Sequence, residues 1–162
     1  MKAREDADTL YSGAEYMMTD LVRLMEGRIA EADVATLYLR PSAILVRPGN
    51  PKSVKDLPDL LKPGMRVIVV QGAGQTGMWE DMIGRTGDVA KVQALRRNIA
   101  AHAPNTGEAK RIWTERPELD AWLVFNIRQV ANPKLADLVP VSKDYVMYRS
   151  TGTALTAPPK RR

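Results

Sequence analysis

The segment that most constrains the fold runs from residue 65 to residue 81. It contains a continuous β-branched run, Val67 to Val70, which is typical of a strand buried on both faces of a sheet. The loop that follows can bring backbone close to a ligand because it holds three glycines, Gly72, Gly74 and Gly77. Thr76 is the predicted N-cap of a helix whose opening turns carry two acids, Glu80 and Asp81. This order of elements predicts an anion site, since the first N–H groups of a helix have no partner within it.

The glycine spacing of this loop also matches the fingerprint of dinucleotide-binding proteins, Gly-x-Gly-x-x-Gly. A complete fingerprint needs a second strand that ends in an acid about 20 residues further on. Residues 88–99 instead have the spacing of a helix. The loop therefore favours a small-anion site, and a nucleotide site or a tight turn without a ligand remain the alternatives.

Composition excludes several other functions. The chain has 162 residues, of which 44% are hydrophobic, enough for the core of one domain or two small lobes. The net charge is +5, but part of the excess lies in the terminal Lys160-Arg161-Arg162, and the single Phe leaves no basic-aromatic stripe for nucleic acid. With no cysteine and one histidine, His102, the sequence predicts no catalytic residue, metal site or cofactor. No apolar run has the length of a membrane span.

Polar junctions between a strand and a helix recur along the chain. Ser12 follows the short predicted strand at 9–11 and precedes a helix at 14–25. Its hydroxyl is either a ligand donor or a simple N-cap. Asn105 follows a predicted strand at 100–103 and is placed as the N-cap of a helix at 108–116, with Trp113 facing inward.

A fourth junction lies at Asn126, after an apolar strand predicted at 119–125. Its side chain either contacts a ligand at the end of the strand or caps the next short helix. Strands alternate with helices, so the predicted fold class is α/β. Repeated polar junctions without a recognisable nucleophile or base favour binding over catalysis.

Three further elements are expected. A long strand over 36–46 is predicted to be interrupted at Arg40-Pro41, because proline removes a donor from the ladder. A short helix is predicted over 53–61 with Ser53 as its cap. A separate strand is predicted over 145–148.

Several long segments of the chain resemble the accessory colonization factor AcfC family. They are Tyr11-Ser12-Gly13-Ala14-Glu15-Tyr16-Met17-Met18, Leu39 to Pro51, Gly72-Ala73-Gly74-Gln75-Thr76-Gly77-Met78-Trp79-Glu80-Asp81, Ala103-Pro104-Asn105, Asp120-Ala121-Trp122-Leu123, and Asn126 with Gln129 to Pro133. The similarity covers about residues 5–156. The wider relatives are the type II periplasmic solute-binding proteins for sulfate and molybdate.

The resemblance implies a function and a set of ligand residues. It implies a periplasmic protein that presents a small oxyanion, or a phosphorylated or carboxylated metabolite, to an ABC-type membrane transporter without chemical turnover. Homodimerisation is compatible with the family. The residues carried over as ligand-binding are Ser12, Gln75, Thr76, Gly77, Asn105 and Asn126. Whether an arginine, Arg40, Arg47 or Arg149, reaches the ligand is left open, and Arg128 stands where the family leads us to expect an aromatic residue.

The resemblance also implies two α/β lobes joined by hinge strands, with the ligand between them. We expect the first lobe to comprise residues 1–48 and 140–162, and the second lobe residues 49–139. The family pattern has an export signal and a first strand before the position of Lys2, and further helices after that of Thr156. We therefore expect an incomplete first lobe and a truncated copy with impaired binding. The alternative is a nucleotide-binding enzyme that uses the glycine loop.

Overall fold

The computed structural model describes residues 9–25 and 27–156. The chain divides into two compact units: unit 1 is Met1–Arg40 with Arg149–Arg162, and unit 2 is Pro41–Tyr148. Strands β2 (Val34–Val46) and β7 (Tyr148–Leu155) each contribute residues to both units. The two ends of the expected first lobe, residues 1–8 and 157–162, lie outside the described residues.

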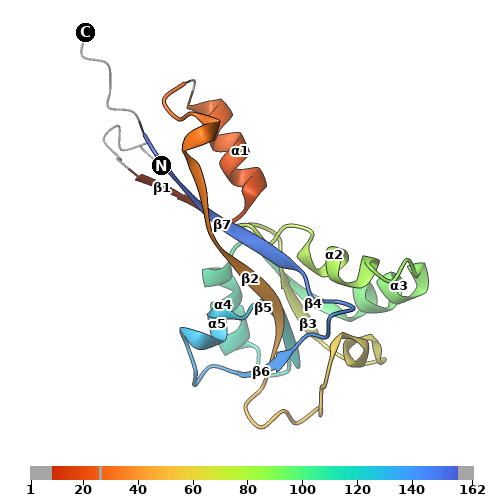
Figure 1. The fold of residues 1–162 in the computed structure, drawn as a ribbon. Helices are drawn as coiled ribbons and strands as arrows, with labels where there is room; N and C mark the ends of the chain where they lie inside the picture. The colour runs from red at the N-terminus through yellow and green to blue at the C-terminus, as the bar shows by residue number, and fades with distance from the viewer. Residues whose placement is uncertain (1–8, 26, 157–162) are drawn as a thin grey trace. The chain divides into compact units, whose positions relative to one another are not determined.

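Unit 2 is built on a mixed sheet with the order β2-β5-β3-β4, in which β6 pairs with the other side of β2 (Figure 1). Strand β3 is parallel to β4 and to β5, whereas β2 is antiparallel to β5, with Ser42 opposite Phe125. The elements in chain order are η2 (Leu57–Leu61), β3 (Val67–Val70), α2 (Met78–Gly84), α3 (Val89–Asn98), β4 (Ile99–Ala103), α4 (Thr106–Glu115), β5 (Ala121–Phe125), α5 (Ile127–Val130) and β6 (Asp137–Pro140).

Helices cover both faces of this sheet, so alternate residues of the same strand enter two separate cores. Val67 and Val69 pack with α2, α3 and η2, whereas Ile68 and Val70 pack with α4 and its Trp113. Every residue of β3 and β5 is buried. The unbroken apolar run of β3 is explained by this two-sided burial, and the prediction of an α/β fold is confirmed.

Unit 1 contains β1 (Thr9–Ser12), α1 (Glu15–Leu24), the short η1 (Glu31–Asp33) and parts of β2 and β7. Strand β1 pairs antiparallel with β7, and Leu10 lies opposite Ala154. Met18 of α1 packs with Ala154 and Ile29 in a small core. The predicted strand at 9–11 and helix at 14–25 are confirmed within one residue of their bounds.

Two local predictions are wrong because side-chain hydrogen bonds and backbone turns override propensity. Ser53 does not cap a helix: Asn50 bonds both the N–H and the C=O of Val54, which holds residues 50–54 as a loop. The helix that follows is the shorter η2, and Asp56 is its cap through a bond from the Leu57 N–H. Tyr145 lies in a turn, donating its N–H to the carbonyl of Ser142, and the last strand begins only at Tyr148.

The predicted interruption at Arg40-Pro41 is also wrong, since β2 runs without a break through both residues. Pro41 has no N–H to donate, but its carbonyl accepts a hydrogen bond from the Asn126 N–H at 3.1 Å. Next to the end of β5, the backbone pairing at this position uses only the Pro41 carbonyl as an acceptor. A residue without an N–H is therefore tolerated inside the strand. The boundary between the two compact units nevertheless falls between Arg40 and Pro41.

Candidate ligand site at the carboxyl ends of the parallel strands

Three of the four predicted junctions belong to unit 2, and the sheet brings them to one edge. The strands β3, β4 and β5 are parallel, and their carboxyl ends are Val70, Ala103 and Phe125. The glycine loop, Asn105 and Asn126 each follow directly after one of these ends. Loops at the carboxyl ends of parallel strands form the usual ligand crevice of open α/β sheets.

The glycine loop packs directly against the turn that follows β4. The Gln71 N–H donates to the Ala103 carbonyl at 2.8 Å. A Cβ atom on Gly72 would lie 2.3 Å from the carbonyl oxygen of Pro104, so no side chain fits there. The close approach of two backbones, rather than a positive φ, explains this first glycine.

The same loop contains three residues in the left-handed region, with φ of 50° at Ala73, 81° at Gly74 and 72° at Gly77. The Gln75 N–H donates to the Gly72 carbonyl at 2.9 Å, and the Met78 N–H donates to the Gln75 carbonyl at 3.0 Å. Two successive turns therefore separate β3 from α2. The sequence shows these turns only as a cluster of glycines.

The predicted N-cap of α2 is wrong by one residue. Gly77, not Thr76, is the N-cap, and its left-handed backbone is one that glycine adopts at little cost. Thr76 is exposed at the end of the loop. The acids expected in the opening turn of the helix, Glu80 and Asp81, are confirmed there.

Asn105 has the capping role that was predicted for it. Its Oδ1 accepts a hydrogen bond from the Glu108 N–H at 2.9 Å, which satisfies one of the free donors at the start of α4. Trp113 of this helix is fully buried, as expected. The Asn105 side chain is thereby held at the sheet edge described above.

Asn126 is half-buried at the end of β5 and makes no side-chain capping hydrogen bond to α5. Its N–H is taken up by the Pro41 carbonyl. Asn126 thus occupies the N-cap position of α5, but its side chain does not cap the helix. The interpretation of its carboxamide as a ligand contact stays a prediction.

Ser12 belongs to unit 1 and has local partners. Its hydroxyl donates to the Ala14 carbonyl at 2.7 Å and accepts from the Ala14 N–H at 3.3 Å, and the residue is buried. Ala14 is the N-cap of α1 and has no side-chain cap. The interpretation of Ser12 as a helix N-cap is therefore wrong.

Gln75 and Thr106 form a contact that the sequence did not reveal. The Gln75 Nε2 donates to the Thr106 Oγ1 at 2.8 Å, which joins the loop after β3 to the first residue of α4. Gln75 itself is only 3% exposed. Thr106 follows an evident helix cap, but its partner lies 31 positions earlier, so local sequence carries no signal for this pair.

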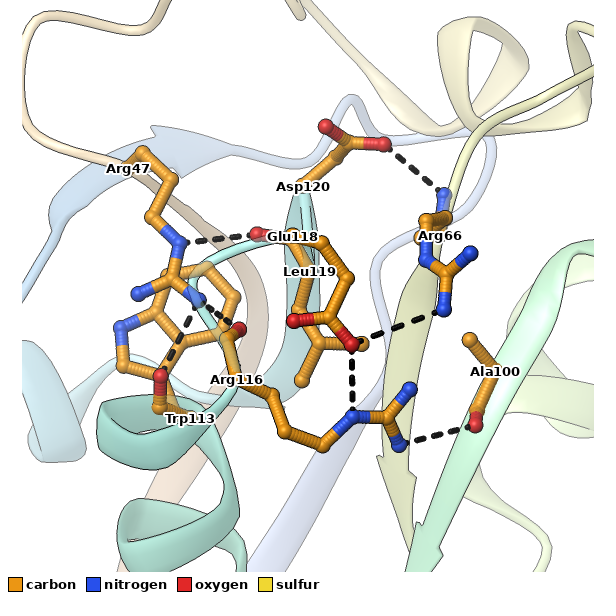
Figure 2. Close-up of polar contacts among 8 residues, drawn as sticks. All are labelled: Arg47, Arg66, Ala100, Trp113, Arg116, Glu118, Leu119 and Asp120. Carbon is orange, nitrogen blue, oxygen red and sulfur yellow. Dashed lines mark hydrogen bonds and ion pairs between the residues drawn. The ribbon is translucent and has the colours of Figure 1, made fainter.

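Arg47 is committed to a different part of unit 2. Figure 2 shows its guanidinium over the ring of Trp113, at 3.7 Å from the ring centroid, while it donates to the carbonyls of Trp113, Arg116 and Leu119. Burial lowers the pKa of the Arg47 guanidinium. These carbonyls lie at the end of α4 and just before β5, at the opposite edge of the sheet from the junctions. Arg47 therefore stabilises the fold and does not reach the candidate site.

Other charged groups in the same region form ion pairs with one another. The Glu118 carboxylate accepts from the Arg116 Nε at 2.8 Å and lies 3.5 Å from the Arg66 guanidinium (Figure 2). Arg116 holds the pKa of the Glu118 carboxyl below its usual value. In unit 1, Arg40 donates to the Gly13 carbonyl, and the Arg149 guanidinium lies 5.8 Å from the Tyr16 ring centroid.

Three further observations on the described chain bear on metal binding, nucleotide binding and membrane insertion. Within residues 9–25 and 27–156, no group of three or more metal-ligating side chains is present. The strand next to β3 ends at Ala103 and is followed by Pro104-Asn105, so the acid required by the dinucleotide fingerprint is missing there. Over the same residues, no helix is both long and apolar enough to cross a bilayer.

Comparison with solved structures finds a similar fold in several binding proteins. A structure described as L-phospholactate-bound PEB3 is 34% identical, with a TM-score of 0.86 over 96% of this chain and 69% of that one. Peb3 from Campylobacter jejuni is 33% identical, with a TM-score of 0.85 over 98% of this chain and 71% of that one. The sulfate-binding protein SubI from Mycobacterium tuberculosis has a TM-score of 0.70 at 19% identity, over 96% of this chain and 61% of that one, and supports the fold alone.

A comparison with curated protein sequences gives no match. The model of the family described as bacterial extracellular solute-binding protein, in contrast, matches residues 1–162. The match covers both units, and the similarity to PEB3 extends over nearly the same length. The chain belongs to the bacterial extracellular solute-binding protein family.

Proposed function

We propose that this protein binds a small oxyanion, or a phosphorylated or carboxylated metabolite, and delivers it in the periplasm to an ABC-type membrane transporter. The proposed ligand residues are Ser12, Gln75, Thr76, Gly77, Asn105 and Asn126. We assign the chain to the AcfC branch of the family, with lobes at 1–48 plus 140–162 and at 49–139. A homodimer is compatible with this proposal.

The observation that carries the proposal is the parallel arrangement of β3, β4 and β5. It gathers the glycine loop, Asn105 and Asn126 at one edge of unit 2, although 54 positions separate Gly72 from Asn126. The groups offered there are amides and a hydroxyl, which are neutral donors suited to an anion. The ligand named for PEB3, L-phospholactate, has the matching chemistry.

The competing proposal of a nucleotide-binding enzyme has less support. It rests on the glycine spacing alone, and the neighbouring strand lacks the acid that would hold a ribose. The same spacing has a structural explanation in the contact between Gly72 and Pro104 and in the left-handed backbone of Gly74 and Gly77.

Thermal unfolding in the presence of single ligands tests the two proposals against each other. The panel comprises sulfate, molybdate, phosphoglycerate, citrate, L-phospholactate and NAD, with sodium chloride as the control for ionic strength. A ligand present at 100 times its Kd stabilises the folded state by about 2.7 kcal/mol, which is about 5–11 °C in Tm for a chain of this size. The proposal predicts such a shift with at least one anion and none with NAD. Stabilisation by NAD alone would overturn it.

A further inference from the structure

One end of the Gln75 carboxamide is left unpaired in the interior of unit 2. The residue is 3% exposed, and its Nε2 donates to the Thr106 Oγ1 at 2.8 Å. Its Oε1 is buried and, among the described residues, has no hydrogen-bond partner. Buried side-chain acceptors almost always have a partner, because burial removes the water that would otherwise donate to them. We therefore expect the Oε1 atom to accept a hydrogen bond from a bound ligand or from a buried water.

This unpaired atom belongs to one of the proposed ligand residues. Gln75 belongs to the glycine loop after β3, and Thr106 is the first residue of α4, directly after Asn105. The Thr106 hydroxyl holds the carboxamide and ties the two loops together. The hydrogen bond from the Gln71 N–H to the Ala103 carbonyl and the contact between Gly72 and Pro104 fix the same two loops. The position of the carboxamide is thus determined by both strand ends.

We propose that Gln75 is the specificity-determining residue of this site, with Thr106 as its positioning residue, and that the site selects an oxyanion carrying its own O–H group. This inference rests on the proposed function and narrows the class of ligand. A carbonyl oxygen attracts an O–H donor and repels the lone pairs of a fully deprotonated oxyanion. Hydrogen phosphate, which retains a proton, and a hydroxyl-bearing phosphate ester fit this acceptor. Sulfate offers acceptors only.

Calorimetric titration with inorganic phosphate and with sulfate, two tetrahedral anions of similar size, tests the inference on the full chain at pH 7. The wild type is expected to prefer phosphate by roughly tenfold or more, the range of one well-formed hydrogen bond to a charged group. Gln75→Met removes the carboxamide at similar length and is expected to bring the ratio close to one, mainly by weakening phosphate. Gln93→Met, on the exposed side of α3, is the matched control and should keep the wild-type ratio.

Thr106 is tested separately by variants of similar size. Thr106→Val removes the hydroxyl and is expected to reduce the preference for phosphate, whereas Thr106→Ser retains the hydroxyl and the preference. Thr114→Val is the control on the same helix, since the Thr114 hydroxyl donates to the Lys110 carbonyl one turn earlier in α4. If thermal unfolding shows that Gln75→Met does not fold, the comparison of Thr106→Val with Thr106→Ser tests the inference instead.

The outcomes separate this inference from the proposal on which it rests. Equal binding of phosphate and sulfate by the wild type leaves the proposed function standing and overturns the inference. A phosphate preference that survives both Gln75→Met and Thr106→Val also overturns it, and would indicate that a buried water satisfies the Oε1 atom. Failure to bind either anion overturns the inference, and failure with the whole thermal panel overturns the proposed function as well.

Discussion

Gly72 offers a sharp test of how the two ligand loops are held together. A Cβ atom at this position would lie 2.3 Å from the Pro104 carbonyl oxygen and 3.4 Å from its carbonyl carbon. Both atoms belong to backbone, so neither can move aside as a flexible side chain would. In Gly72→Ala the two loops must therefore separate or the strand ends must shift.

The expected magnitude follows from the contacts that such a shift breaks. Overpacking in an ordered interior costs roughly 1–3 kcal/mol. Loss of the hydrogen bond from the Gln71 N–H to the Ala103 carbonyl adds about 0.5–1.5 kcal/mol. We expect Gly72→Ala to lower the free energy of unfolding by about 1.5–4.5 kcal/mol in total, a decrease in Tm of about 3–18 °C for this chain length.

Two further glycine variants serve as controls in the same urea and thermal unfolding experiments. A Cβ atom on Gly84, at the end of α2, meets nothing within 4 Å, so Gly84→Ala should be neutral or stabilising by about 0.5–1 kcal/mol. Gly77 has open space but a φ of 72°, so Gly77→Ala should cost about 1–2 kcal/mol through backbone strain alone. A Gly72→Ala protein within 0.5 kcal/mol of the wild type would refute the close approach of the loops.

Three other perturbations test the surrounding structure. Arg47→Met keeps the apolar stem but loses the hydrogen bonds to three carbonyls and the contact with Trp113. Urea unfolding should show that the free energy of unfolding falls by about 2–4 kcal/mol. A decrease below about 1 kcal/mol would contradict the structural role of Arg47. Asn105→Ala should lower the free energy of unfolding by about 1 kcal/mol because the helix cap is lost, whereas Asn105→Asp should retain most of the stability. An alanine variant as stable as the wild type would argue against the cap. The hydrogen bond from Lys62, helped by the Lys55 N–H, holds the pKa of the Asp59 carboxyl below its ordinary value of 3.8. Because the folded-state pKa is depressed, this stabilisation is present above the ordinary pKa and is lost as the pH falls through the folded-state pKa. The difference in stability between the wild type and Asp59→Asn should therefore shrink between pH 5 and pH 2, and a constant difference would contradict the pairing.

The sequence predicted those parts of the fold that depend on local pattern. The run Val67–Val70 indicated a strand buried on both faces, and the structure buries all four residues between two helical layers. Asn105 was recognised as a cap because cap chemistry is local. The alternation of strands and helices was sufficient to predict an α/β fold.

The errors arose where distant or unusual contacts decide the conformation. Thr76 has the chemistry of a cap, but the helix begins one residue later because Gly77 adopts a left-handed conformation. Pro41 suggested a break in β2, yet its carbonyl is paired with the Asn126 N–H, a contact that sequence proximity does not reveal. The pairing of Gln75 with Thr106 was missed for the same reason.

Amide chemical shifts locate the bound ligand on the protein. Phosphoglycerate, the hydroxyl-bearing phosphate ester of the thermal panel, is titrated into the isotopically labelled full chain, and the shifts of backbone and side-chain amides are followed. A ligand site at this edge of the sheet predicts saturable changes concentrated at the glycine loop, at Asn105 and Thr106, and at the Asn126 carboxamide. Changes confined to the groove of about 420 Å³ lined by Lys110, Asn132, Pro133, Lys134 and Leu135, with none at the carboxyl ends of β3, β4 and β5, would contradict it.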